Sequence, residues 1–309
     1  MIKKHNVGKK KKVIKVMGII LSVIVVLLLL TSLWMASFVM TGTRQTMEEA
    51  MRWQSERYDT SFYENLQKTD YTVSGYKGYL LHVELLKNPV STNKYIILSH
   101  GYTDNRIGSL KYVRMYLNLN YNCIIYDLRG HGENKKTFTT YGILEAKDLA
   151  LLVKDTIERY PDLEQLGLHG ESLGAASTIT SLKYQPQVDF VVADCGFSDI
   201  ENVLRGGYRN AHVPTFMVDI ADIGAMLRYH YSLKKMRPID SLNDNQIPIL
   251  FIHGAEDTFI LPKNSENMAK RTKGRQEFYL IDGAGHAESI LTDPENYQKY
   301  VEAFLKKLK

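Results

Sequence analysis

Residues 168–174 read Leu-His-Gly-Glu-Ser-Leu-Gly and contain the pattern G-x-S-x-G, with Ser172 at its centre. Glycines two residues away on each side suit a turn too tight for bulky neighbours, which would hold the serine hydroxyl above a sheet edge. An apolar run precedes the pattern and Ala175 opens a helical stretch, so the context favours this interpretation. A serine that caps a helix in a glycine-rich turn is the alternative. We predict that Ser172 is a nucleophile, and its expected partners along the chain support this choice.

A nucleophilic serine needs a base to accept its proton and a carboxylate to orient that base. On a sheet that carries such a turn, the three groups follow in the order serine, acid, histidine. Asp257 comes directly after an apolar run that is typical of a strand, and His286 lies in a glycine-rich loop after the next such run. The sequence therefore predicts the catalytic triad Ser172, Asp257 and His286, with Glu256 and Asp282 as alternative acids.

The tetrahedral intermediate of acyl transfer also needs hydrogen-bond donors for its oxyanion. The stretch 99–103, Ser-His-Gly-Tyr-Thr, follows an early strand, where one such donor is expected. We predict an oxyanion hole made by the backbone N–H groups of Tyr102 and Leu173. A simple glycine turn is the alternative for the first of these.

Short apolar runs alternate with segments of helical period along the rest of the chain. The runs are continuously apolar, which is typical of strands buried on both faces of a sheet. This alternation predicts an α/β fold with a mostly parallel, doubly wound sheet. A gap at residues 196–246 carries helical patterns and is predicted to form a helical lid over the carboxyl ends of the strands. The predicted strands are 79–85, 95–99, 122–127, 166–169, 190–194, 249–253 and 278–281, and the predicted helices are 143–160, 172–184, 263–273 and 293–308.

Four blocks of sequence carry a resemblance to a known superfamily. They are residues 100–103, the Asp-Leu-Arg-Gly-His-Gly-Glu stretch 127–133, the 170–174 pattern, and the pair 253–257 and 283–286. On these blocks the chain from about Lys68 onward resembles the α/β-hydrolase superfamily, in its branch of serine aminopeptidase-like and monoacylglycerol-lipase-like bacterial hydrolases. The resemblance implies an eight-stranded sheet, a lid after the sixth strand and no cofactor. It also implies that His131 is structural.

The N-terminal 40 residues have a different composition from the rest of the chain. Residues 1–15 hold seven of the 39 basic residues and none of the 34 acidic ones, so the remainder offers no general electrostatic attraction for nucleic acid. Residues 16–40 carry no charge and are long enough, at 1.5 Å per residue, to cross a hydrocarbon core of about 30 Å. The run is longer than a signal-peptide core and lacks a clear cleavage site, so we predict a transmembrane anchor, with a cleaved signal peptide as the alternative.

The lysine block sets the expected topology. Basic segments stay cytoplasmic, so residues 1–15 form a cytoplasmic tail and residues 41–309 lie on the outer side of the cell membrane. Residues 41–68 are expected to form a stem, with a helix near 44–58, that stands the hydrolase domain, residues 69–309, off the membrane.

These patterns predict a membrane-anchored serine hydrolase that cleaves an ester or other acyl substrate, lipid or small molecule, through an acyl-enzyme. An aminopeptidase-like serine peptidase is the alternative, and it would need acids such as Glu171, Asp199 or Glu201 to hold a substrate ammonium group. A non-catalytic scaffold protein on the same fold is less favoured, because no triad member is missing. Nucleic acid is not an expected partner. The two cysteines are expected to be buried free thiols, and their spacing predicts no metal site.

Overall fold

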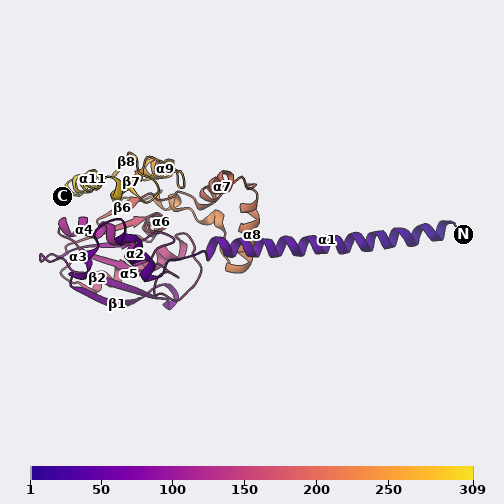
Figure 1. The fold of residues 1–309 in the computed structure, drawn as a ribbon, viewed down its shortest axis with the longest axis horizontal. Coiled ribbons are helices and arrows are strands. Elements are labelled where there is room, and N and C mark those ends of the chain that lie inside the picture. Colours follow the sequence, from indigo (N-terminus) through magenta and orange to yellow (C-terminus); the bar gives the residue numbers. More distant parts are fainter. Residues whose placement is uncertain (1, 309) are drawn as a thin grey trace.

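The continuously apolar runs form one mixed sheet in the computed structural model, which describes residues 2–308 (Figure 1). Its eight strands lie in the order β1-β2-β4-β3-β5-β6-β7-β8. β2 is antiparallel to both of its neighbours, and all other pairs are parallel. The mostly parallel sheet predicted from the sequence is therefore confirmed. The strands are β1 (Lys68–Ser74), β2 (Leu80–Leu86), β3 (Lys94–Ser99), β4 (Asn122–Tyr126), β5 (Gln165–Glu171), β6 (Phe190–Asp194), β7 (Ile249–Gly254) and β8 (Gln276–Ile281).

The strand β1 was not predicted from the sequence. It pairs only with β2 at the edge of the sheet, and most of its side chains are partly or fully exposed. Its sequence, Lys-Thr-Asp-Tyr-Thr-Val-Ser, is polar because an edge strand faces water on one side and is protected by charge from pairing with other chains. The strand β1 therefore lacks the apolar run by which the other strands were predicted.

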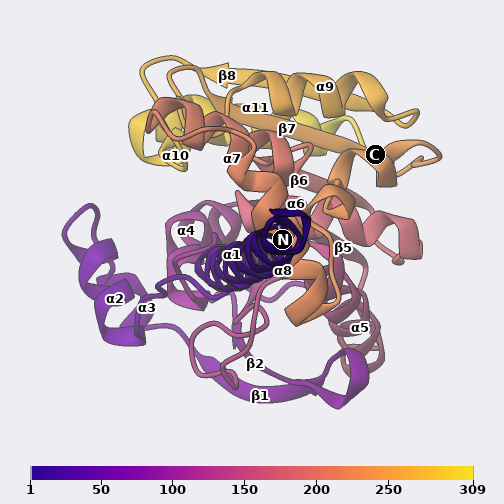
Figure 2. The ribbon, with the colours of Figure 1, turned by 90° about the vertical axis from the view of Figure 1, so that its right-hand side faces the viewer.

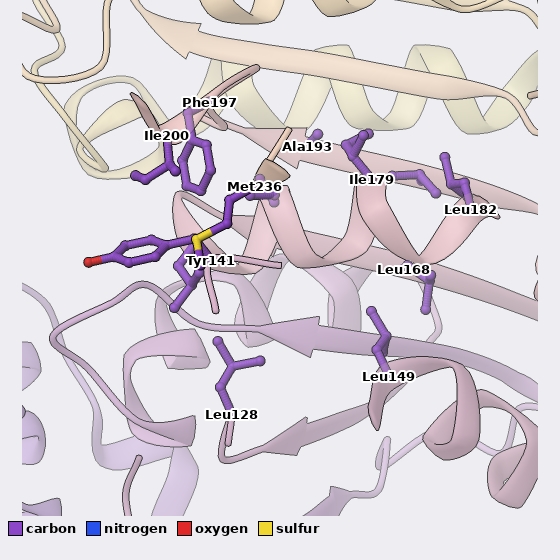
Figure 3. Close-up of a cluster of buried hydrophobic side chains, with 14 of the residues drawn as sticks. Leu128, Tyr141, Leu149, Leu168, Ile179, Leu182, Ala193, Phe197, Ile200 and Met236 are labelled. Carbon is purple, nitrogen blue, oxygen red and sulfur yellow. The ribbon is translucent and has the colours of Figure 1, made fainter. Parts of the chain in front are cut away.

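Helices cover both faces of the sheet and create two hydrophobic cores. One face is covered by α4 (Leu110–Asn118) and α11 (Pro294–Lys306). The other is covered by α5 (Ile143–Arg159), α6 (Leu173–Ser181) and α9 (Lys263–Arg271). Figure 3 shows the second core, with Ile179 and Leu182 among sheet side chains and Phe197, Ile200 and Met236 at its lid end. The remaining short elements are α3 (Ser61–Glu64), α10 (Ser289–Thr292), η1 (Tyr76–Gly78), η2 (Arg106–Ser109), η3 (Leu182–Tyr184), η4 (Leu233–Lys235) and η5 (Pro238–Leu242).

The long connection between β6 and β7 forms two helices, α7 (Ile200–Asn210) and α8 (Met217–Tyr229). Both lie at the end of the domain from which the N-terminal helix α1 (Ile2–Met40) projects (Figure 1). Seen along α1, α8 lies directly against it (Figure 2). The predicted lid segment is thus joined to the predicted membrane span.

The contact between α1 and α8 is close. The hydroxyl of Ser32 donates a hydrogen bond to the carbonyl of Ile220 at 2.7 Å. Gly224 makes this approach possible, because a Cβ at that position would lie 2.0 Å from the Ser32 carbonyl oxygen. Met35 and Met40 of α1 are buried in the core of the domain. Five of the last nine residues of the predicted span, Ser32, Met35, Ala36, Val39 and Met40, are therefore buried by the domain, whereas residues 12–31 are exposed.

Residues 41–68, expected to be a stem, lie against the domain. The guanidinium of Arg44 donates hydrogen bonds to the carbonyl of Gly130, to that of Thr137 at 2.8 Å and to the Thr139 hydroxyl at 2.7 Å. The helix α2 (Met47–Ser55) falls within the expected range and buries Gln54, whose amide donates to Asp104. This segment is a layer of the folded domain, because its polar groups find partners there rather than in water.

Candidate active site

Ser172 lies at the sharp turn between β5 and α6. Its φ angle is +52°, a left-handed conformation that is strained for a non-glycine residue and that lifts the side chain clear of the sheet. A Cβ on Gly170 would lie 2.3 Å from the Gly174 carbonyl oxygen, and one on Gly174 would lie 2.0 Å from that of Ser99. The G-x-S-x-G pattern is therefore a steric requirement of this turn.

His286 and Asp257 lie beside the serine. The Nε2 atom of His286 is 3.0 Å from the Ser172 hydroxyl, and its Nδ1 is 2.7 Å from Oδ2 of Asp257. The backbone N–H groups of Phe259 and Ile260 donate to the other carboxylate oxygen at 2.9 and 2.8 Å. Burial by itself would raise the pKa of Asp257, but hydrogen bonds from His253 and His286 hold it well below its ordinary value. The carboxylate is thus charged and positioned to accept a hydrogen bond from the Nδ1–H group of His286.

The two backbone amides predicted to form the oxyanion hole belong to residues beside Ser172. Within residues 2–308, the N–H groups of Tyr102 and Leu173 have no intramolecular acceptor. Both residues line the cavity at the serine. The loop of Tyr102 is held by Nε2 of His131, which lies 2.7 Å from the Tyr102 carbonyl. Burial lowers the pKa of His131 well below its ordinary value, so this histidine is neutral and has a structural position.

A second histidine contacts the acid, and the sequence did not single it out. Nε2 of His253 lies 3.1 Å from Oδ2 of Asp257 and 2.7 Å from the Ile260 carbonyl, and its Nδ1 lies 2.7 Å from the Ser265 hydroxyl. Both neighbours of Nε2 are acceptors, so we assign the proton to Nε2. The signal was present in the block 253–257, from which the sequence analysis took only the candidate acids Asp257 and Glu256.

The three acids considered for an ammonium site are all engaged by neighbouring side chains. Glu171 accepts from the Tyr112 hydroxyl at 2.5 Å and forms a buried ion pair with Lys111. Asp199 is paired with Arg237 and caps α7, and Glu201 with Arg205 at 2.6 Å. None of the three presents an unpaired charge to a substrate.

Ser172 opens into a cavity of about 640 Å³, which is the size of a typical small-molecule site. Its walls come from segments far apart in the sequence and are mostly apolar. The end of α1 contributes Phe38 and Val39, α2 contributes Trp53, and α7 contributes Val203 and Leu204. The residues from α1 and α2 were assigned to an anchor and a stem in the sequence analysis, so their part in the site was missed.

Comparisons with known proteins agree on the fold. The sequence profile of the prolyl oligopeptidase family matches residues 108–308. The uncharacterized protein YqkD of Bacillus subtilis is 32% identical over 255 residues, which are 79% of this chain and 81% of the relative. The Pyrococcus furiosus esterase Pf2001 has a TM-score of 0.68 at 23% identity, over 81% of this chain and 94% of that one. An acylaminoacyl peptidase of Pyrococcus horikoshii has a TM-score of 0.59 at 15% identity, over 81% of this chain and 43% of that one. The predicted α/β-hydrolase fold is confirmed.

Proposed function

Because the chain belongs to the prolyl oligopeptidase family and is a hydrolase of the α/β-hydrolase superfamily, we propose that it is a membrane-anchored serine hydrolase that cleaves acyl esters. The observation that carries the proposal is the continuous hydrogen-bonded series from Ser172 through His286 to Asp257, beside two amides that are unpaired within residues 2–308. This series supplies the groups that acyl transfer needs, and each group lies within hydrogen-bond distance of the next.

In this mechanism the Ser172 oxygen attacks the acyl carbon while Nε2 of His286 accepts its proton. The N–H groups of Tyr102 and Leu173 donate to the developing oxyanion, each worth on the order of 3 kcal/mol. The ester C–O bond then breaks, and the alcohol leaves with the proton from His286. Water attacks the acyl-enzyme with His286 as base, releases the acid and restores the serine hydroxyl. Asp257 orients the imidazole and stabilises its cation.

The engaged acids favour an ester over an N-terminal amino acid as the substrate. A peptide ammonium group would have to displace Lys111 from Glu171, Arg237 from Asp199 or Arg205 from Glu201. The Lys111–Glu171 pair is buried, so displacing Lys111 would leave its charge buried and unpaired, which costs several kcal/mol. The apolar cavity favours a substrate with a hydrocarbon acyl group instead.

Membrane attachment is supported by α1. Within the described residues, Lys12–Met40 is the one helix long and apolar enough to cross a membrane, with a mean hydropathy of 3.0. We propose that it is an uncleaved anchor with the lysine-rich tail in the cytoplasm and the catalytic domain outside. N-terminal sequencing of the mature protein tests this, because a start beyond Met40 contradicts an anchor.

A fluorophosphonate probe tests the proposed activity on the full-length protein in detergent. We expect the wild type to be labelled and Ser172→Ala to lose the label entirely. Ser91→Ala, at an exposed position outside the site, is the matched control and should label like the wild type. A folded wild type that does not react would contradict a serine hydrolase. Turnover of 4-nitrophenyl esters but not of aminoacyl 4-nitroanilides would separate the esterase from the aminopeptidase.

A further inference from the structure

The wall of the catalytic cavity includes the end of the proposed membrane anchor. Phe38 and Val39, from the last turn of α1, line the cavity that Ser172 opens into, together with Val203 and Leu204 of α7. The loop that carries Tyr102, a proposed oxyanion donor, also joins the site to α1. The Tyr102 hydroxyl donates to the Val39 carbonyl at 3.0 Å and accepts from the Gly42 amide at 3.0 Å. The anchor therefore helps to form the site as well as tethering it.

The cavity reaches the surface where α1 leaves the domain. Phe38 lines the cavity and is nevertheless 67% exposed, so it lies at the mouth. Trp34, one turn earlier, is also 67% exposed and stacks on Phe38 at 6.1 Å. Aromatic rings of this kind are enriched where a membrane helix meets the polar interface. One edge of the mouth is thus formed beside the exposed aromatic rings of α1.

The lid adds an apolar surface beside this mouth. Phe216, Ile223 and Leu227 are each more than half exposed, and their spacing of seven and four residues places them on one face of α8. Gly224, about 100° round the helix from Ile223, lies on the adjacent side of α8, which packs on Ser32 of α1. The exposed face lies next to α1, because α8 crosses α1 in close contact (Figures 1 and 2).

The length of the exposed part of α1 sets the depth at which α8 would lie relative to the membrane. The exposed uncharged part of α1, residues 16–31, would span about 24 Å, most of the roughly 30 Å hydrocarbon core. Ser32, which bonds to Ile220, then lies at the boundary of that core. A surface with large exposed apolar side chains at this depth would face lipid rather than water.

The geometry points to a lipid ester of the outer leaflet as the substrate, whose acyl chain passes laterally from the bilayer along Phe38 into the cavity. This inference rests on the proposed serine hydrolase activity and specifies its substrate class. The face of α8 formed by Phe216, Ile223 and Leu227 rests in the interface and keeps the mouth at the level of the acyl chains. A water-soluble peptide or short ester would reach the cavity from water and would not need a mouth at the level of the acyl chains.

Full-length protein in phosphatidylcholine vesicles tests the inference with two substrates. One is a bilayer lipid ester, monooleoylglycerol, and the other is the soluble ester 4-nitrophenyl acetate. The variant combines Phe216→Ser, Ile223→Ser and Leu227→Ser, none of which lines the cavity. Val90→Ser, an exposed apolar residue before β3, is the matched control. We expect the triple variant to lose at least about tenfold in turnover of the lipid, while fluorophosphonate labelling and acetate turnover stay within about twofold.

A second variant tests the cavity itself. Val203→Trp fills part of the cavity wall and should move the preferred 4-nitrophenyl ester from dodecanoyl to butanoyl, with an unchanged circular dichroism spectrum as evidence of a folded domain. The lipid inference is overturned if the wild type turns over the acetate but not the lipid, or if the triple variant is as active as the wild type on the lipid. Absence of labelling in the wild type would instead overturn the proposed hydrolase activity.

Discussion

His253 is the residue whose contact with the proposed acid most affects the electrostatics of the site. Its Nε2 proton is shared between Asp257 and the Ile260 carbonyl, and it withdraws charge from the carboxylate that faces His286. His253→Phe removes this donor at similar volume. More negative charge then faces His286 and favours its imidazolium, so the acid limb of the kcat/KM profile should shift to higher pH and kcat/KM should fall about tenfold.

The control for His253 is its Gln variant, which keeps an N–H donor. His253→Gln should restore part of the rate and return the acid limb toward that of the wild type. A rate that falls without movement of the acid limb would mean that His253 acts only through packing.

Asp104 makes the stability of the domain depend on pH. Burial raises the pKa of this carboxyl to about 6, above its ordinary value of 3.8, with Gln54 and the Asn105 amide as its donors. A raised folded-state pKa contributes stability that is present below about pH 4 and is lost as the pH rises through about 6. Asp104→Asn should therefore raise the Tm at pH 8 relative to pH 5 by roughly 2–5 °C. Thermal unfolding followed by circular dichroism at both pH values measures this, and an equal change at both contradicts it.

Among the elements, the α1–α8 contact has the least steric tolerance. Gly224→Leu places a side chain where the Ser32 backbone lies and should separate the two helices. We expect faster proteolysis in the segment 211–216 and a lower Tm. The free energy of unfolding should fall by an amount typical of overpacking, about 1–3 kcal/mol. Gly206→Ala on α7 is the control, because nothing lies within 4 Å of its added Cβ, and it should be neutral or slightly stabilising. Unchanged proteolysis of the Leu variant would show that the lid does not depend on the anchor.

The elements that could be predicted from the sequence are those whose signal is local. The strands β2 to β8 were recognised because each is a short apolar run, and Ser172, Asp257 and His286 were selected because each follows such a run in a loop rich in glycine. Whether these three residues act as a triad stays a prediction until the serine is labelled.

The parts that could not be predicted depend on distant partners. Arg44 bonds to Thr137 and Thr139, more than 90 residues away, so residues 41–68 carried no local sign that they belong to the domain. In the sequence, Phe38 is one more apolar residue of the predicted membrane span. The residues next to it in the sequence gave no sign that it lines a cavity. A helical period shows that a segment has an apolar face, but not what covers it.

On the scale of the whole molecule, the boundary between anchor and domain lies inside α1. A soluble form that starts at residue 42 would lose the buried side chains of Met35, Val39 and Met40, together worth on the order of 5 kcal/mol. A form that starts at residue 31 keeps them. We expect the longer form to unfold at least about 10 °C higher in scanning fluorimetry and to hydrolyse dodecanoyl esters faster. Equal melting temperatures of the two forms would show that the end of α1 adds nothing to the core.

The bond between Ser32 and Ile220 joins α1 to a residue made 188 positions later in the chain. During biosynthesis the anchor would therefore enter the bilayer with its last turns uncovered, and it would wait there until most of the chain had been exported. With α1 as the proposed anchor, the lid would fold onto its partner only after translocation. The cavity wall that α1 contributes would then be completed at the membrane.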